Sequence, residues 1–275
     1  MIQAKVITDS VSTAGVRITT LELQYPRFIH GEVMTHRVFS RNAMSSRAIP
    51  VAKMVEQVRS NPATPVHWGK NQPGMQANEQ LTGAALESAK GLWLSAAQQA
   101  ADLAERMVDL GLHKQATNRI LEPFQWMRTL ITSTEWDNFF ELRAHPDAQP
   151  EFHELALQMQ AAMDGSKSVL RSSGSDVDSW HLPYVLDSER YLYRPSILLK
   201  LSTARCARVS YLTHEGDRPD INKDIALYDR LVGSRPIHAS PAEHQARALP
   251  GGATKSRNFR GWTQHRSLLE EKLPC

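Results

Sequence analysis

The feature that most constrains the fold is one long amphipathic segment, Thr82 to Leu110. Its apolar residues recur at helical spacing, and Gly111 follows it. Such spacing places the apolar side chains on one face of a helix, and glycine is common just beyond a helix C-terminus. The sequence therefore predicts one helix over the whole segment. The apolar positions are Leu86, Ala89, Trp93, Ala97, Ala100, Ala104 and Val108.

The remaining chain predicts a strand and several shorter helices. Residues 14–24 alternate and are rich in β-branched side chains, which favours a strand that stops at Pro26. Loops are predicted where glycine, proline and small polar residues gather. The result is a mixed fold in which helices dominate. Helices are predicted at the start of 28–47 and over 114–124, 132–146, 151–163, 223–232 and 261–272, a strand or helix start at 207–212, and loops at 62–79 and 165–178.

Composition predicts a globular cytoplasmic protein. Of 275 residues, 41% are hydrophobic and 22% charged, an ordinary balance for a chain with a core. We expect no membrane span, since no apolar run approaches about 18 residues, and no signal peptide. Cys206 and Cys275 make no disulfide framework, as is usual in a reducing compartment. The net charge of +3 is too small to argue for nucleic acid as a partner.

The stretch THRVFSRNAMSSR, residues 35–47, concentrates hydrogen-bond donors. Arg37, Arg41 and Arg47 alternate with serines and an asparagine, and no acid lies nearby to pair with them. Arginine and hydroxyl groups together bind phosphate, so the stretch favours a nucleotide or a phosphorylated cofactor. The alternative is a basic surface helix. Aromatic residues for base stacking are few, which argues against a nucleic-acid groove.

The same stretch resembles the signature of the flavin-dependent thymidylate synthases, R-H-R-x-x-S-x-N-x-x-S-x-R. Two positions depart from the pattern: Thr35 replaces its first arginine, and Ala43 stands where the family often has glutamate. The matching residues are His36, Arg37, Ser40, Asn42, Ser45 and Arg47.

Two further segments extend the resemblance in the usual order. NFFELRAHPDAQ supplies Asn138 and Arg143, and NRILEPF supplies Arg119. The pieces that normally begin the family, ARVS (207–210) and HASPAEH (238–244), come near the C-terminus instead. The chain therefore resembles a circularly permuted member, a rearrangement that is tolerated when the termini lie close together at the surface.

A partial repeat accompanies the permutation. RGWTQHR (260–266) resembles the helical lead-in to the signature, so the chain carries that lead-in twice. This leaves open whether His36 or His265 contacts flavin. We favour His36, because the rest of the signature follows it.

The resemblance implies an α+β fold of the flavin-dependent thymidylate synthase type, with mixed helices, an antiparallel sheet and a permuted chain order. We expect a single domain over 1–275. Within it, 1–163 would hold the signature and the nucleotide, 164–200 would connect, and 201–275 would be the part that is usually N-terminal.

The resemblance also implies the chemistry. FAD, reduced by NADPH, would transfer a one-carbon unit from methylenetetrahydrofolate to C5 of a pyrimidine deoxynucleoside monophosphate, dUMP becoming dTMP. The family works as a homotetramer with active sites between subunits. Arg143 would be catalytic, because a fixed, permanently charged guanidinium beside N3 stabilises the deprotonated pyrimidine. Substrate-binding residues would be Glu32, Ser45, Ser46, Arg47, Arg119 and Arg143, and cofactor-binding residues His36, Arg37, Asn138, Ser210, His238 and Ser240.

Departures from the family pattern keep alternatives open. Thr35 and Thr134 remove two arginines from the expected cofactor shell, and Arg260 and Arg266 are candidates to replace them. Glu32 stands where glutamine is frequent and Asp147 where histidine is frequent. An ionised acid accepts hydrogen bonds from an exocyclic amine. One alternative is therefore a dCMP/dUMP methylase or hydroxymethylase, and another is a non-catalytic nucleotide- or nucleic-acid-binding relative.

Two other chemistries are disfavoured by the sequence. Cys206 lies beside Arg205 and Arg208, which would lower a thiol pKa, but its apolar neighbours favour a small buried residue over a nucleophile. The histidines are scattered, and the spacing of His238 and His244 does not match the metalloprotease pattern, so we expect no metal. His181 is expected to pack.

Overall fold

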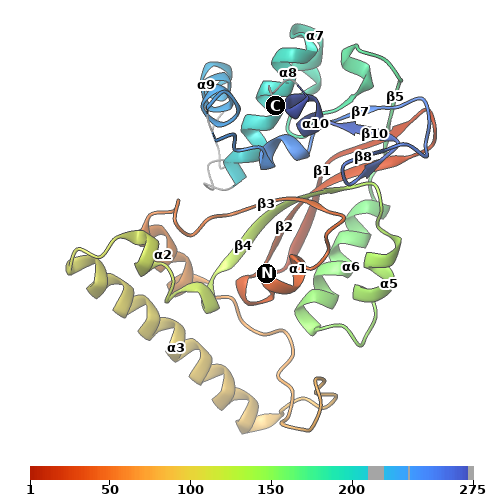
Figure 1. The fold of residues 1–275 in the computed structure, drawn as a ribbon. Coiled ribbons are helices and arrows are strands. Elements are labelled where there is room, and N and C mark those ends of the chain that lie inside the picture. Colours follow the sequence, from red (N-terminus) through yellow and green to blue (C-terminus); the bar gives the residue numbers. More distant parts are fainter. Residues whose placement is uncertain (210–219, 235, 272–275) are drawn as a thin grey trace.

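A five-stranded sheet lies at the centre of the molecule (Figure 1). The computed structural model describes residues 1–209, 220–234 and 236–271. The strand order is β3-β4-β2-β1-β5, and all neighbours are antiparallel except β1 and β5. This sheet and its surrounding helices confirm the α+β fold class. The strands are β1 (Gln3–Ser12), β2 (Arg17–Pro26), β3 (Ser40–Ala43), β4 (Trp126–Ser133) and β5 (Val169–Arg171).

The main hydrophobic core lies against one face of this sheet. Successive strand residues point to opposite faces, and Leu21, Leu23 and Tyr25 of β2 are all buried in this core with Phe152 and Leu155. The helices of the first part of the chain contribute the rest. They are α1 (His30–Val33), α2 (Val51–Ser60), α3 (Gly83–Asp109), α4 (Lys114–Thr117), α5 (Asp137–Arg143) and α6 (Pro150–Asp164).

The C-terminal part of the chain packs against the other face. Leu130 of β4 is buried there with Cys206 and Val209. Figure 1 shows these elements gathered on one side of the central sheet. They are α7 (Asp187–Leu192), α8 (Pro195–Arg208), α9 (Ile221–Val232), α10 (His265–Glu270), the sheet β10-β7-β6 (Trp262–Gln264, Ala246–Ala248, Trp180–His181) and the hairpin β8–β9 (Lys255–Ser256, Phe259–Arg260).

A buried chain of hydrogen bonds ties the two parts together. Ser10 Oγ contacts His181 Nδ1 at 3.0 Å, and His181 Nε2 contacts Thr20 Oγ1 at 2.8 Å. Thr20 Oγ1 then meets Thr132 Oγ1 at 2.7 Å, which meets His244 Nδ1 at 2.8 Å. Buried polar groups that satisfy one another in this way give an interface one defined geometry. His181 is therefore a polar link across the sheet, where the sequence predicted a packing residue.

Several predicted elements are confirmed. The strand predicted over 14–24 is β2, and the long helix is α3. Helices α6 and α9 match the predictions over 151–163 and 223–232.

Other predictions were wrong because tertiary partners decided the conformation. The predicted helix over 114–124 is only α4 and the 3-10 turn Glu122–Phe124, and the helix expected from Thr132 starts at Asp137. Thr132 lies in β4, which β2 and β3 flank on both sides. A strand buried on both faces lacks the alternation that would have revealed it.

The helical start predicted for 28–47 is confirmed, because the 3-10 turn Arg27–Ile29 runs into α1, and β3 follows. Two further segments differ from expectation. The expected loop over 165–178 contains the strand β5. The repeated lead-in RGWTQHR (260–266) is not a helix, because its residues Trp262–Gln264 form a strand that pairs with β7, and only the short α10 follows. Residues 207–209 continue from α8, while 210–212 lie outside the described residues.

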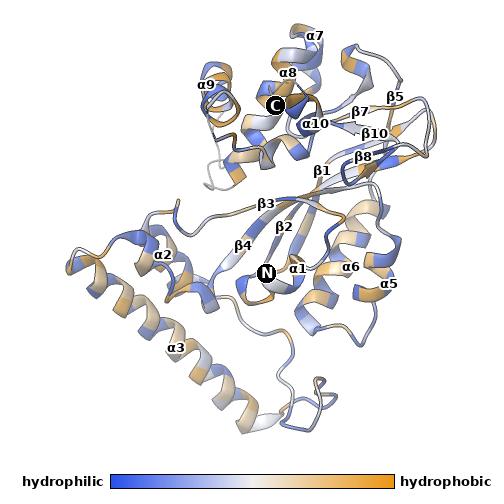
Figure 2. Cartoon of the chain, in the orientation of Figure 1, coloured by the Kyte–Doolittle hydropathy of each residue, from blue (hydrophilic) through white to orange (hydrophobic). Residues whose placement is uncertain are grey.

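The long helix α3 leaves part of its apolar surface open. Apolar residues occur along its whole length (Figure 2), and Leu92, Leu94 and Leu103 are exposed. Leu92 and Leu103, eleven residues apart, lie on the same side of this helix, whereas Leu94 lies on another side. None of the helices among the described residues is long and apolar enough to cross a membrane.

Candidate active site

Arg143 and His36 meet at the base of the sheet. Arg143 is the last residue of α5, and His36 lies in the loop between α1 and β3. Arg143 Nε donates to His36 Nε2 at 3.0 Å, and the guanidinium lies 4.8 Å from the centre of the Phe152 ring. The structure thus brings together the predicted catalytic arginine and one predicted cofactor residue, and both side chains stay partly exposed.

Aromatic rings hold His36 in this position. Its ring lies 5.8 Å from that of Phe39, 5.0 Å from Phe139 and 5.7 Å from Phe152. Burial lowers the pKa of His36, and the charges of Arg143 and Arg41 lower it further. An arginine Nε–H can only donate, so His36 accepts at Nε2 and is neutral, with its proton on Nδ1.

Glu32 interacts electrostatically with both Arg143 and Glu151. Burial raises the pKa of Glu32, the charge of Arg143 opposes that rise, and Glu151 adds to it. Glu151 is buried and accepts a hydrogen bond from the Val66 backbone N–H at 2.7 Å. Arg143 therefore lies near the carboxyl group of Glu32 and bonds to the imidazole of His36, and such polar groups suit a planar polar ring. Sequence reasoning missed Glu151 and Phe152, and no motif marked them.

A second cluster forms around Glu122. Its Oε1 accepts from Arg119 at 2.8 Å, from Arg27 at 3.0 Å and from Ser46 Oγ at 3.4 Å. Asn118 fixes the same turn, because its Nδ2 donates to the Ser46 carbonyl at 2.7 Å. The structure thus joins the predicted phosphate residues Ser46 and Arg119, with Ser45 and the exposed Arg47 on either side of Ser46. Sequence reasoning missed Glu122, although it follows Arg119 by three residues, a spacing that favours pairing.

The two clusters are separate within one chain. Between the described residues, no hydrogen bond or ion pair joins the Arg143 group to the Glu122 group. Grooves of about 290 and 760 Å³ lie along α2, and neither is lined by Arg143 or His36.

The signature strand β3 is covered by the C-terminal part of the chain. Asn258 Nδ2 donates to the Val38 carbonyl at 2.9 Å, and Gln264 Nε2 donates to Ser40 Oγ at 3.1 Å. Asn42 Nδ2 donates to the Cys206 carbonyl at 2.7 Å. Segments from opposite ends of the chain therefore meet on the signature.

The predicted cofactor residues beside this junction are exposed donors. Arg37 precedes β3, Asn138 lies in α5, and His238 and Ser240 lie at the turn before His244; all four are exposed. Ser210 lies outside the described residues. Exposed guanidinium, amide, imidazole and hydroxyl groups fit the phosphates and carbonyls of a flavin nucleotide.

Arg260 approaches a position where the family arginine is missing. Its backbone N–H donates to Thr134 Oγ1 at 3.0 Å, and its side chain is exposed. Arg266, the other candidate replacement, is engaged by Glu243 and Glu270. His265 is buried with its ring 6.2 Å from that of Trp180, so it is less accessible than His36.

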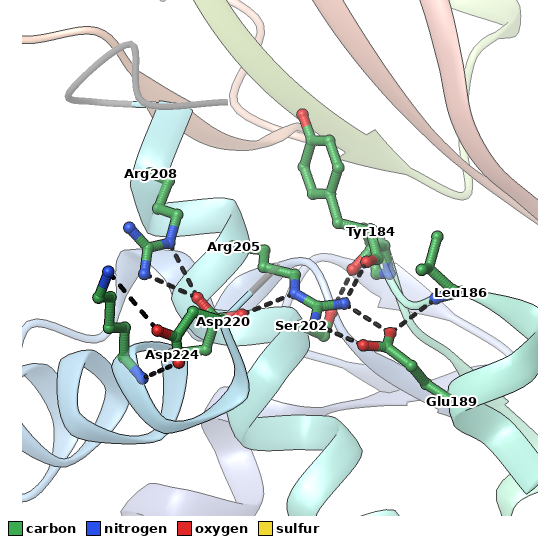
Figure 3. A network of polar contacts seen from close by, with 10 residues as sticks. Tyr184, Leu186, Glu189, Ser202, Arg205, Arg208, Asp220 and Asp224 are labelled. Carbon is green, nitrogen blue, oxygen red and sulfur yellow. Dashed lines mark hydrogen bonds and ion pairs between the residues drawn. The ribbon is translucent and has the colours of Figure 1, made fainter. Parts of the chain in front are cut away.

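An ionic network fixes the end of α8, where the ARVS motif begins (Figure 3). Arg205 binds both oxygens of Glu189 at 2.6 Å and donates through Nε to Asp224 at 2.8 Å. Arg208 donates to the other oxygen of Asp224 at 2.9 Å. These two guanidinium groups and two carboxylates balance in charge, and buried ionic groups require such pairing.

Cys206 is structural. It is fully buried, and burial raises its thiol pKa well above the ordinary value. A thiol in this setting stays protonated and is a poor nucleophile. The expectation that Cys206 is a small buried residue is confirmed.

Comparison with known proteins was made at three levels. The sequence pattern of the family described as "Thymidylate synthase complementing protein" matches residues 12–165. A search of curated proteins found no match. A solved structure of the UMP/dUMP methylase PolB from Streptomyces cacaoi, bound with 5-Br UMP, is 18% identical, covers 59% of this chain and 88% of its own, and has a TM-score of 0.49.

A second structure of the same methylase, with 5-Br dUMP, is also 18% identical. It covers 59% of this chain and 90% of its own, with a TM-score of 0.46. The family match spans more than half of the sequence and includes the signature, Arg119 and Arg143. The chain therefore belongs to the thymidylate synthase complementing protein family.

Proposed function

We propose that this protein is a flavin-dependent enzyme that transfers a one-carbon unit from methylenetetrahydrofolate to C5 of a pyrimidine deoxynucleotide, converting dUMP to dTMP. The observation that carries the proposal is the contact between Arg143 and His36, which fixes a cation in a contact between two partly exposed side chains that the family motifs supply. Family membership supports methylation of a pyrimidine nucleotide.

Arg143 would activate the pyrimidine. C5 of uracil is a weak nucleophile, and a guanidinium at N3 and its neighbouring carbonyl stabilises the anionic ring, so that electron density rises at C5. Phe152 and His36 hold the guanidinium from two directions, which preorganises it for this role. The burial of Cys206 supports activation by charge over attack by a thiolate.

The Glu122 cluster would bind the nucleotide phosphate. Glu122 holds Arg119 next to Ser46, and Ser45 and Arg47 stand free to turn toward an anion. Because no polar contact between the described residues links this cluster to Arg143, we propose that the two clusters serve active sites shared between subunits of a homotetramer. The exposed apolar residues of α3 supply a surface for such an assembly.

FAD would lie where the C-terminal part meets β3. When bound, it supplies carbon transfer and hydride chemistry, with NADPH as its reductant. Arg37, His36, Asn138, His238, Ser240 and Ser210 would hold it. Arg260 would replace the arginine missing at Thr134. One domain over 1–275 remains our proposal, with 164–200 connecting its two parts.

A second candidate substrate follows from Glu32. Its carboxyl group lies close enough to Arg143 for their charges to interact, in the place where a pyrimidine would be read. An ionised Glu32 would accept from the exocyclic amine of cytosine. This favours dCMP as an alternative substrate, with a methyl or hydroxymethyl product.

Product analysis tests both versions. Purified protein is incubated with FAD, NADPH, methylenetetrahydrofolate and either dUMP or dCMP, and the products are weighed by mass spectrometry. We expect a methylated dUMP product. A hydroxymethylated product, or turnover of dCMP alone, would select the second candidate. A colourless protein with no turnover that instead binds DNA with a steep salt dependence would reject the enzyme.

A further inference from the structure

Two arginines between α6 and α8 are buried or half-buried, and among the described residues neither of them forms an ion pair. Arg171, at the end of β5, is 7% exposed, and no described residue accepts a hydrogen bond from its Nε. Arg190, in α7, is partly buried and donates to the carbonyl oxygens of Val177 and Trp180, each at 3.3 Å. Arginine is almost never fully buried unless it is paired. An anion would supply what this region lacks.

The positive charges of Arg171 and Arg190 affect each other and the buried His181. Burial lowers the pKa of Arg190 to about 10, and the charge of Arg171 is the next cause. Both arginines also lower the pKa of buried His181, after burial itself. Asp178 and Asp187 oppose the lowering of the pKa of both arginines, but both aspartates are exposed, and neither forms an ion pair with Arg171 or Arg190.

The surrounding backbone fixes the arginines beside a serine-rich turn. Arg171 pairs with Ser12 of β1, and the sequence SSGSD follows directly. Ser173 Oγ lies 3.1 Å from Thr13 Oγ1, and Ser179 Oγ donates to the Asp176 carbonyl at 2.8 Å. Hydroxyl groups and guanidinium groups together are the usual protein ligands of phosphate.

We propose that Arg171 and Arg190 form a binding site for a phosphate group, separate from the nucleotide site at Arg47 and Arg119. A phosphate dianion carries two negative charges for the two guanidinium groups, whereas a carboxylate or chloride carries one. The family match ends at residue 165, before both arginines. The group would come from free phosphate or from a phosphorylated small molecule.

Calorimetric titration of the full chain tests the site. The nucleotide site is first blocked with dUMP or, should dUMP not bind, by using the Arg47→Ala protein throughout. Inorganic phosphate and ribose 5-phosphate are then titrated at constant ionic strength. We expect saturable binding of one phosphate group per chain, weakened at least tenfold by Arg171→Gln and by Arg190→Gln. If inorganic phosphate binds as tightly as ribose 5-phosphate, the source is free phosphate, whereas tighter binding of ribose 5-phosphate, or its binding alone, indicates a phosphorylated small molecule.

Arg247→Gln is the matched control. Arg247 lies nearby in β7 with its guanidinium 5.9 Å from the Trp180 ring, and this variant should bind as the wild type does. Arg190→Lys keeps the charge and serves if a glutamine variant does not fold. The proposal is overturned if neither probe saturates, if both glutamine variants bind normally, or if Arg247→Gln weakens binding equally. Failure of dUMP turnover would reject the proposed function and leave this site standing.

Discussion

Arg143 Nε donates to His36 Nε2 over 3.0 Å, and this bond joins the end of α5 to the signature loop before β3. The two residues are far apart in the chain, and each was assigned a role from a different motif. Their contact gives the proposed chemistry a definite geometry, which the following experiments examine.

Replacing Arg143 should remove turnover without removing flavin. Arg143→Lys keeps the charge but loses the planar fork that holds His36 and faces a pyrimidine. We expect kcat to fall about 10²–10³-fold, as for loss of a preorganised charge-stabilising group. Steady-state kinetics and the flavin absorbance spectrum measure the two effects. Arg230→Ala, at an exposed position of α9, is the control; full activity in Arg143→Lys would reject the assigned role.

Replacing Arg47 should weaken binding of the phosphate alone. Arg47 is exposed beside Ser46, so its guanidinium is available to the nucleotide. We expect Arg47→Ala to cost about 2–5 kcal/mol in dUMP binding if the phosphate is left buried and unpaired. Calorimetry with dUMP and with deoxyuridine separates a loss of phosphate binding from a loss of binding to the rest of the nucleotide. A similar loss for deoxyuridine, which has no phosphate, would contradict the assignment.

The buried histidines should make the protein sensitive to acid. Burial lowers the pKa of His244 from its ordinary value of 6.5 to about 3, and burial is the largest cause that lowers the pKa of His30 to about 4. Above pH 6.5 both histidines are neutral in the folded and in the unfolded protein. Below pH 6.5 the unfolded chain binds protons at these histidines, whereas in the folded chain they stay neutral. Folding stability therefore falls as the pH drops toward the folded pKa values.

His244→Gln isolates one part of this effect. For His244 the loss between pH 6.5 and pH 5 should be about 2 kcal/mol, since one pKa unit is worth about 1.4 kcal/mol. Urea unfolding at pH 7 and pH 5 measures it. The variant should be less stable at pH 7 but lose less on acidification; an unchanged pH dependence would show that His244 is not responsible.

The two aspartates of α9 should differ sharply in their contribution to stability. The side chain of Asp224 is 1% exposed between Arg205 and Arg208, whereas that of Asp229 is 55% exposed opposite Lys200. Asp224→Asn leaves buried cations short of charge and should cost about 3–5 kcal/mol. Asp229→Asn should cost less than about 1 kcal/mol. Urea unfolding compares the two, and equal losses would mean that the network is not buried in solution.

Cys206 should be dispensable for turnover. Cys206→Ala removes the thiol from a buried site and should cost about 1 kcal/mol or more of folding stability through the small cavity that remains. The rate of dUMP turnover, measured well below the melting temperature, should stay near that of the wild type. Loss of turnover in folded protein would return a thiolate mechanism to consideration.

Much of the signature chemistry was readable from the sequence, because motifs record residue type and spacing. The segment 35–47, Arg119 and Arg143 pointed to the family before any geometry was known, and the long helix followed from its periodicity. Both depend on residues close together in the chain. The same local reasoning failed for β4 and β10, because a strand is stabilised by neighbours that are distant in sequence.

The tertiary structure decided which groups meet. Only folding brings His36 under Arg143, places Glu122 between Arg27 and Arg119, and lays Asn258 on Val38. It also buries Arg171 so that no described residue accepts a hydrogen bond from its Nε, which no spacing in the sequence predicts. The physical reason is that hydrogen bonds, charges and burial act over distances in space. A sequence specifies which side chains are available, while their neighbours and exposure, and so their pKa values, arise from the packing of the whole chain.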